Sequence, residues 1–181
     1  MRIITGSARG RNLKTPKGSK IIRPALSQVR EAIFSSLGDL HGKVVLDVFA
    51  GTGSLGLEAL SRGAAKAYFV DNHSQAIGLI LENLKHLGFE DRAHVFKRKV
   101  PTGLSSIKLE HKADIIFCDP PYDKGLIDPS LTALAAQVYV DENTLILIEH
   151  TKREIPSAPK FEFLKQKKFG QTYISYLKLR K

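Results

Sequence analysis

The chain has 181 residues, of which 43% are hydrophobic and 25% are charged, and it contains one cysteine. This length suits one domain with a sizeable core, and the composition excludes general disorder. No apolar run approaches the ~20 residues that cross a bilayer, and no secretory signal follows the basic start. A lone cysteine excludes an intrachain disulfide. We therefore expect a cytoplasmic protein without a membrane partner.

The net charge of +10 is unevenly distributed along the chain. Residues 1–30 hold eight Lys/Arg and no acid, residues 31–150 hold eleven Lys/Arg and sixteen acids, and residues 151–181 hold nine Lys/Arg and two acids. Two basic ends therefore flank a mildly acidic body. This distribution indicates a polyanionic partner and favours nucleic acid.

The first forty residues predict a small hairpin followed by a helix. Segments 2–5 and 11–14 flank a glycine-bounded loop, and an apolar stripe predicts a helix from about Ser27 to Leu37 that ends at Gly38. Arg30 falls beside this stripe, on or near the polar face. We expect residues 1–40 to form an N-terminal extension and residues 41–181 to form the main domain.

From Lys43 onward, short apolar strands alternate with helices, which predicts an open parallel sheet with both faces covered. Asp128 is expected to cap the helix after the fourth strand, with Pro129 in its first turn. Expected strands are 44–49, 66–71, 94–97, 113–118 and 144–149, and expected helices are 54–62, one that ends at Gly88, a short doubtful one after 97, and one from Asp128.

The last part of the chain breaks this alternation. Residues 160–169 and 172–179 are separated only by Gly170-Gln171, which leaves no room for a crossover helix, so they predict an antiparallel hairpin. The complete expectation is an α/β, Rossmann-like fold with a mostly parallel seven-stranded sheet that ends in this hairpin.

A glycine-rich loop joins the first strand to the next helix. Gly51, Gly53 and Gly56 satisfy the G-x-G-x-x-G pattern, which brings backbone amides close to a ligand at a helix N-terminus. Asp71 ends the second strand, 20 residues after Gly51, where a carboxylate accepts hydrogen bonds from a ribose. Asp47 lies just before the loop and suits a cationic amino group better than a phosphate, so the pattern favours S-adenosylmethionine (SAM) over NAD.

A second motif, Asp119-Pro120-Pro121-Tyr122, follows the fourth strand at the carboxyl edge of the sheet, where open α/β folds bind ligands. The prolines fix the backbone, so the Asp119 carboxylate and the Pro120 carbonyl form rigid acceptors for an amino group with two donors. Tyr122 offers a flat face on which an extruded base can stack. By composition alone, a stiffened turn would explain the same residues.

Together, the two motifs resemble those of SAM-dependent class I methyltransferases that modify exocyclic amino groups. The N-terminal segments Arg2-to-Gly6, Arg9-Gly10-Arg11, Arg23-Pro24 and Val29-to-Phe34, with Phe169-to-Thr172 near the end, resemble the bacterial RsmD family. That family methylates N2 of a guanine in small-subunit (16S) rRNA. The resemblance covers essentially the whole chain.

The resemblance implies a role for each matching position. Asp119 and the Pro120 carbonyl would hold the guanine amino group, and Tyr122 would stack on the base. The in-line displacement at the sulfonium methyl would then gain most from positioning and electrostatics, with no metal, and the six histidines show no metal-ligand spacing. The cofactor residues would be Asp47, Phe49, Ala50, Gly51 and Gly53 for the methionine part, Asp71 for the ribose, and Asn72 and Val100 for the adenine.

Two positions depart from the family pattern. Lys99 stands where an acidic or amide residue is expected to contact the adenine amino group, so Val100 packing would carry adenine recognition alone. Gln28 stands where a basic residue often precedes Val29, which weakens the assignment of an RNA surface there.

Phosphate contacts are expected from Arg9, Arg11, Arg23 and Arg30, which makes residues 1–40 an RNA-binding extension.

Other functions remain open on the sequence. A DNA adenine-N6 methyltransferase uses the same tetrad, although 181 residues leave little room for a target-recognition region. A basic NAD-binding or non-catalytic RNA-binding protein would leave the tetrad unused. The resemblance implies small-subunit rRNA within an assembled or assembling 30S particle as the substrate. The sequence does not determine the oligomeric state, and a monomer is the simplest expectation.

Overall fold

The computed structural model describes residues 1–16 and 24–181, with the backbone alone at 24–26. A seven-stranded sheet has the order β3-β2-β1-β4-β5-β7-β6, and the expected mostly parallel α/β fold is confirmed. The strands are β1 (Val44–Val48), β2 (Lys66–Asp71), β3 (Ala93–Lys97), β4 (Ile115–Cys118), β5 (Leu145–His150), β6 (Phe161–Phe169) and β7 (Thr172–Leu179). The helices are α1 (Pro24–Leu37), α2 (Ser54–Ser61), α3 (Ser74–Leu87) and α4 (Ile127–Ala135), with 3-10 turns η1 (Glu90–Arg92) and η2 (Leu104–Ser106).

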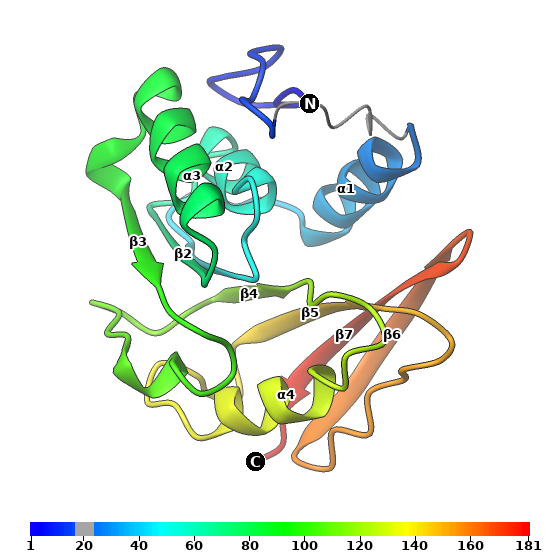
Figure 1. The fold of residues 1–181 in the computed structure, drawn as a ribbon. Helices are drawn as coiled ribbons and strands as arrows, with labels where there is room; N and C mark the ends of the chain where they lie inside the picture. Colours follow the sequence, from blue (N-terminus) through cyan, green and yellow to red (C-terminus); the bar gives the residue numbers. More distant parts are fainter. Residues whose placement is uncertain (17–23) are drawn as a thin grey trace.

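The sheet lies between two layers of helices (Figure 1). Helices α1, α2 and α3 cover one face, and α4 covers the other. The strand alternation explains this arrangement, because successive residues of a buried strand point to opposite layers. In β4, for example, Ile116 packs in the core beneath α4, whereas Phe117 packs with α1.

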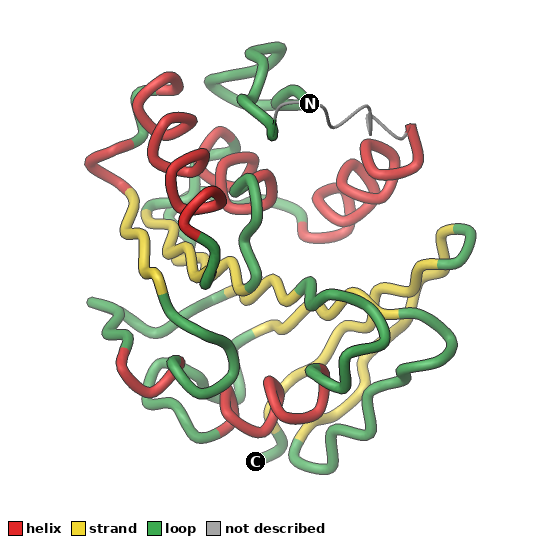
Figure 2. Tube along the Cα trace, in the orientation of Figure 1, coloured by secondary structure: helices red, strands yellow, loops and turns green. Residues whose placement is uncertain are grey.

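The last two strands form the expected antiparallel hairpin (Figure 2). β7 pairs antiparallel with β5 and with β6, and the β6–β7 register shifts between Phe163 and Lys165. β6 is the outer edge of the sheet, and most of its side chains are exposed. No helix in the described part of the chain is both long and apolar enough to span a membrane.

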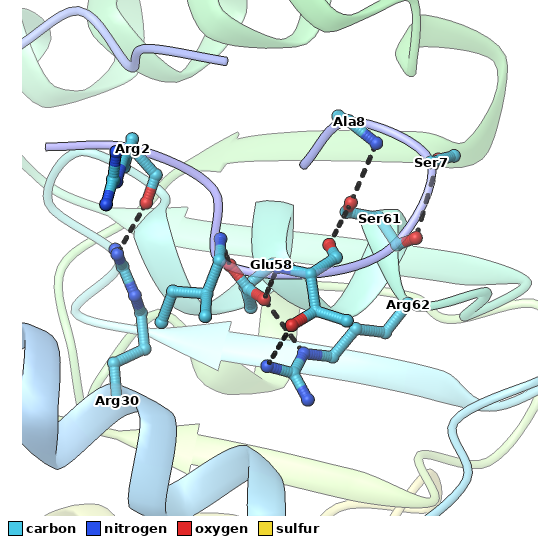
Figure 3. A network of polar contacts seen from close by, with 9 residues as sticks. Arg2, Ser7, Ala8, Arg30, Glu58, Ser61 and Arg62 are labelled. Carbon is cyan, nitrogen blue, oxygen red and sulfur yellow. Dashed lines mark hydrogen bonds and ion pairs between the residues drawn. The ribbon is translucent and has the colours of Figure 1, made fainter. Parts of the chain in front are cut away.

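The N-terminal segment, residues 1–16, forms a short hairpin with one antiparallel bridge, Arg2 to Asn12, and it is attached to α2 (Figure 3). Backbone hydrogen bonds from Ile3 to Arg11 (3.0 Å) and from Leu13 to Met1 (2.8 Å) join its two arms. The buried Glu58 carboxylate accepts hydrogen bonds from the backbone N–H groups of Ile4 (2.7 Å) and Thr5 (3.0 Å). The same carboxylate pairs with Arg62 at 2.8 Å. The carboxylate of Glu58 thus satisfies two backbone N–H groups of the N-terminal segment and fastens the segment to α2.

Two details differ from the expectations. Arg30 is only 5% exposed, rather than on a polar face, because its guanidinium is covered by the N-terminal segment, where its Nη2 donates to the Arg2 carbonyl at 2.6 Å. Asp128 does not cap α4. Its carboxylate instead accepts hydrogen bonds from the backbone N–H (2.9 Å) and hydroxyl (2.6 Å) of Ser157, so it ties the helix to a later loop.

Candidate active site

The loop between β1 and α2 is held in a tight left-handed turn. Phe49, Gly51 and Gly53 all have positive φ angles, of 63°, 56° and 76°. Phe49 is strained there because a side chain disfavours this conformation, and such strain concentrates at functional sites. Gly53 also lacks space, since a Cβ would lie 3.1 Å from the Ile80 side chain. The positive φ angle and this tight contact together favour glycine at position 53.

Protein carboxylates already occupy key amides of this loop. The Gly51 N–H donates to Asp71 Oδ2, and the Gly56 N–H donates to Asp47 Oδ2, both at 2.9 Å. Asp71 Oδ1 also accepts from the His73 N–H at 2.8 Å. A pyrophosphate would need such amides as donors and would meet these carboxylates. The loop therefore suits a ligand without phosphate, as expected for SAM.

Two cavities open at the carboxyl edge of the sheet. The α1 cavity, of about 560 Å³, lies among α1, the N-terminal segment and the glycine-rich loop. The Asp71 cavity, of about 510 Å³, lies among the ends of β2, β3 and β4. Phe49, Asp119 and Glu149 line both cavities. These three side chains therefore mark the place where ligands in the two cavities would meet.

The Asp119-to-Tyr122 tetrad forms one wall of the Asp71 cavity. Asp119 is exposed to solvent within the two cavities, directly after the buried strand β4. Protein atoms that crowd the end of β4 reduce its hydration, and together with repulsion from Glu149 and Asp47 they raise the pKa of Asp119 well above the ordinary value. Tyr122 is 43% exposed, and its hydroxyl donates to Glu149 Oε1. The tyrosine ring is thus accessible while its hydroxyl is fixed.

The expected cofactor residues fall into three groups. Ala50 and Gly51 line the α1 cavity, whereas Asp47 and Gly53 line neither cavity. Asp47 is 2% exposed, and burial raises its pKa to about 7. Asp47 therefore holds the start of α2 through Gly56. The remaining expected cofactor residues line the Asp71 cavity, together with Lys99. They are Phe49, Asp71, Asn72 and Val100.

The sequence interpretation missed Glu149, which ends up at the centre of the site. The register pairs Cys118 with Ile148, so Asp119 and Glu149 follow as neighbours at the ends of β4 and β5. The place of Glu149 at the carboxyl end of an expected strand was the signal that could have marked it as a site residue. Poor hydration raises the pKa of Glu149, as it does for Asp119.

The four arginines expected to contact RNA occupy different environments. Arg9 is exposed, and Arg23 lies outside the described residues. The Arg11 guanidinium donates to the carbonyls of Leu87, at 3.3 Å, and His86 at the end of α3. Arg30 lines the α1 cavity from within. A phosphate contact at the outer surface therefore does not fit Arg30.

Comparison with known proteins gives a consistent result along the whole chain. Residues 1–178 match the family model described as "Conserved hypothetical protein 95". The chain is 35% identical to "Putative rRNA methyltransferase YlbH" of Bacillus subtilis, over 99% of this chain and 100% of the relative. It is 34% identical to "Ribosomal RNA small subunit methyltransferase D" of Escherichia coli, over 88% of this chain and 79% of the relative.

Solved structures agree with the sequence relatives. The chain superposes with a TM-score of 0.86 on "Putative methyltransferase yhhF" from Escherichia coli, at 31% identity over 99% of this chain and 98% of that chain. A Thermus hypothetical protein gives a TM-score of 0.80 at 29% identity over 99% of each chain. Both similarities extend over the N-terminal segment, the sheet and the terminal hairpin.

Proposed function

The chain belongs to the RsmD family of ribosomal RNA small subunit methyltransferases, and from this premise we propose that it transfers a methyl group from SAM to the exocyclic N2 amino group of a guanine in 16S rRNA. One observation carries the proposal. Asp119, the first residue of the tetrad, lines both cavities, so a single carboxylate reaches the ligand in each.

The donor set fits SAM. Bound SAM supplies an electrophilic methyl group on a cationic sulfur. Asp71, Asn72 and Val100 line a cavity suited to the adenosine part, whereas Ala50 and Gly51 lie toward the other cavity. The occupied loop amides disfavour a dinucleotide. Asp119 and Glu149 place negative charge where the two cavities meet, which suits a cationic ligand.

The residues of the tetrad would hold and orient the nucleophile. The Asp119 carboxylate and the Pro120 carbonyl accept hydrogen bonds from the two protons of the guanine amino group. These bonds fix the direction of the nitrogen lone pair and favour its pyramidal geometry. The exposed Tyr122 ring stacks on the base. The rate gain comes from positioning, for which effective molarity gives about 7–11 kcal/mol.

Proton removal from the methylated amine would fall to the same region. Both Asp119 and Glu149 have raised pKa values because they are poorly hydrated. A carboxylate with a raised pKa is a better base than an ordinary one. Asp119 is the acceptor for the departing proton because it already receives a hydrogen bond from the reacting nitrogen.

Residues 1–40 would serve as the RNA-binding extension of a catalytic domain at 41–181. Arg9 is exposed for a phosphate contact, and the basic C-terminal part adds further positive charge. We propose a cytoplasmic monomer that acts on the rRNA of an assembled or assembling 30S particle. A DNA adenine-N6 activity is not favoured, because the named relatives are rRNA methyltransferases.

The decisive test is the modification state of rRNA in a deletion strain. Mass spectrometry of small-subunit rRNA should reveal the loss of one N2-methylguanosine, and re-expression of the intact gene should restore it. An unchanged set of methylated guanosines would refute the proposal. Calorimetry of the purified protein should show binding of SAM and no binding of NAD.

A further inference from the structure

Glu149 occupies a position that the reaction described above leaves without a defined role in substrate recognition. It follows Ile148 at the carboxyl end of β5, beside Asp119 of the neighbouring strand. It lines both cavities, and it receives the hydroxyl hydrogen bond of Tyr122 on Oε1. Among the described residues, no hydrogen bond is made to Oε2. One carboxylate oxygen is therefore left for a ligand.

The α1 cavity has walls that suit a flat purine whose amino group points to the junction with the Asp71 cavity, where Asp119 and Glu149 line both cavities and Pro120 and Tyr122 line the adjoining one. Val29, Ile33, Phe49 and Leu55 supply apolar surface, and Asp119 and Glu149 supply acceptors. Arg30 lines the same cavity and supplies hydrogen-bond donors. A base that presents donors on one edge and acceptors on another would satisfy both kinds of group. Guanine has this pattern, with N1–H and N2–H₂ as donors and O6 and N7 as acceptors.

We propose that Glu149 determines the specificity for guanine by accepting a hydrogen bond from guanine N1–H, while Asp119 and Pro120 hold the adjacent N2 amino group. This inference rests on the proposed function. Because N1–H and N2–H₂ lie side by side on the base, two neighbouring carboxylates match them. Adenine would instead direct its N1 lone pair at a carboxylate, and the two would repel.

The electrostatics of the pair agree with this assignment. Asp119 and Glu149 are poorly hydrated, and the charge of Glu149 further raises the pKa of Asp119. Two adjacent carboxylates repel each other when both are ionised, and this costs free energy unless hydrogen-bond donors lie between or in front of them. A guanine edge brings three N–H groups and relieves this cost. The pair of carboxylates therefore favours a ligand that donates on that edge.

The test compares guanine with 2-aminopurine at the target position. 2-Aminopurine keeps the 2-amino group but has an unprotonated N1 and no O6. Small-subunit rRNA carrying either base at the nucleotide identified by mass spectrometry is made by RNA ligation and reconstituted into particles. Transfer of tritiated methyl groups then gives kcat/KM for each base, and the ratio of the two values measures specificity.

The wild-type protein should prefer guanine by about 5- to 150-fold, which is the range for one well-placed base contact. Glu149→Gln should reduce this ratio to a few-fold or less, because a side-chain amide can accept from N1–H or donate to a bare N1. Glu149→Ala should also lose the preference. Glu142→Gln removes the same charge from an exposed turn before β5 and should keep the wild-type ratio.

Calorimetry with SAM shows that each variant is folded, and a folded Gln or Ala variant with the wild-type ratio would overturn the role of Glu149. Failure of the wild-type protein to methylate the guanine particle would instead overturn the proposed function. The specificity ratio separates recognition from a merely structural role, since a loss of stability lowers activity on both bases equally.

Discussion

Asp119 combines two properties that rarely coincide in one carboxylate. Solvent reaches it through both cavities, yet poor hydration and neighbouring negative charges raise its pKa. Such a group is positioned to hold an amino group and to take its proton. We expect Asp119→Ala still to bind SAM in calorimetry, because Glu149 keeps negative charge where the two cavities meet. Methyl transfer to small subunits should fall by about 10²–10⁴-fold, and full activity would contradict the assignment.

Asp47 makes stability depend on pH. Burial raises its pKa to about 7 from an ordinary value of 3.8. Between these two pKa values the folded protein binds more protons than the unfolded chain. The contribution of Asp47 to stability is therefore lost as the pH rises from about 4 to about 7. The free energy of unfolding falls by up to about 1.4 kcal/mol per pH unit in this range. Asn at this position cannot ionise, and its amide oxygen can still accept the Gly56 N–H bond.

Urea unfolding at pH 5 and pH 8 checks this expectation. The free energy of unfolding of Asp47→Asn minus that of the wild type should be larger, that is more stabilising for the variant, at pH 8 than at pH 5. Other titrating groups are common to both proteins and cancel in the difference. A difference that does not change with pH would show that Asp47 does not titrate in this range.

The local motifs were predictable, whereas their long-range partners were not. The glycine-rich loop and the tetrad each occupy a short stretch of chain, so spacing alone identified them. The position of Glu149 beside Asp119 depends on β4 and β5 being neighbours, and the burial of Arg30 involves its contact with Arg2 of the N-terminal segment. Asp128 likewise satisfied its carboxylate through Ser157, a loop residue far along the chain. No local pattern encodes these contacts.

The strands and helices before the terminal hairpin were predicted well, because their apolar residues follow the period of each element. The hairpin followed from chain length alone, since Gly170-Gln171 cannot hold a crossover. Helix α1 begins at Pro24, before the expected Ser27. Proline is favoured in the first turn of a helix, so the helix can begin there, ahead of the start that the apolar residues indicated. The attachment of the N-terminal segment to α2 through Glu58 was not predicted.

This attachment can be tested with two glycines of the same segment. Gly6 and Gly10 have similar φ angles of +87° and +81°, but a Cβ on Gly6 would lie 1.8 Å from the Ser61 carbonyl oxygen, whereas a Cβ on Gly10 meets nothing within 4 Å. Gly10→Ala should therefore cost only the left-handed backbone strain of about 1–2 kcal/mol. Gly6→Ala should cost about 1–3 kcal/mol more because of the clash.

Chemical denaturation of the two variants gives this difference directly. Both substitutions add one methyl group in a left-handed conformation, so each is the control for the other. Limited proteolysis should also cut residues 1–13 faster in Gly6→Ala than in Gly10→Ala. Equal stabilities would mean that the segment does not rest on α2 as described.

The charge of the whole molecule predicts a steep salt dependence of RNA binding. The two basic ends carry the excess of positive charge, and exposed Lys165 and Lys168 lie on the outer strand β6. Replacing both by Gln should reduce the slope of log K against log salt by about 0.7–0.9 for each phosphate that the variant no longer neutralises. Filter binding of small-subunit rRNA between 50 and 200 mM salt, roughly the range in which such effects are large, measures the slope.

The matched control removes two exposed lysines outside the basic ends, with Lys85→Gln on α3 and Lys108→Gln after η2. This pair should leave the slope near its wild-type value. If both double variants lowered the slope equally, binding would follow net charge alone, and the C-terminal hairpin would have no special part in it.

The position of β6 has one more consequence, which concerns self-association. An outer strand exposes unpaired backbone N–H and C=O groups, and a flat outer strand invites a second molecule to extend the sheet. Here the register shift between Phe163 and Lys165 distorts the strand, and lysines along it repel another copy. The lysines proposed to meet RNA therefore also protect the protein from aggregation while its RNA is absent.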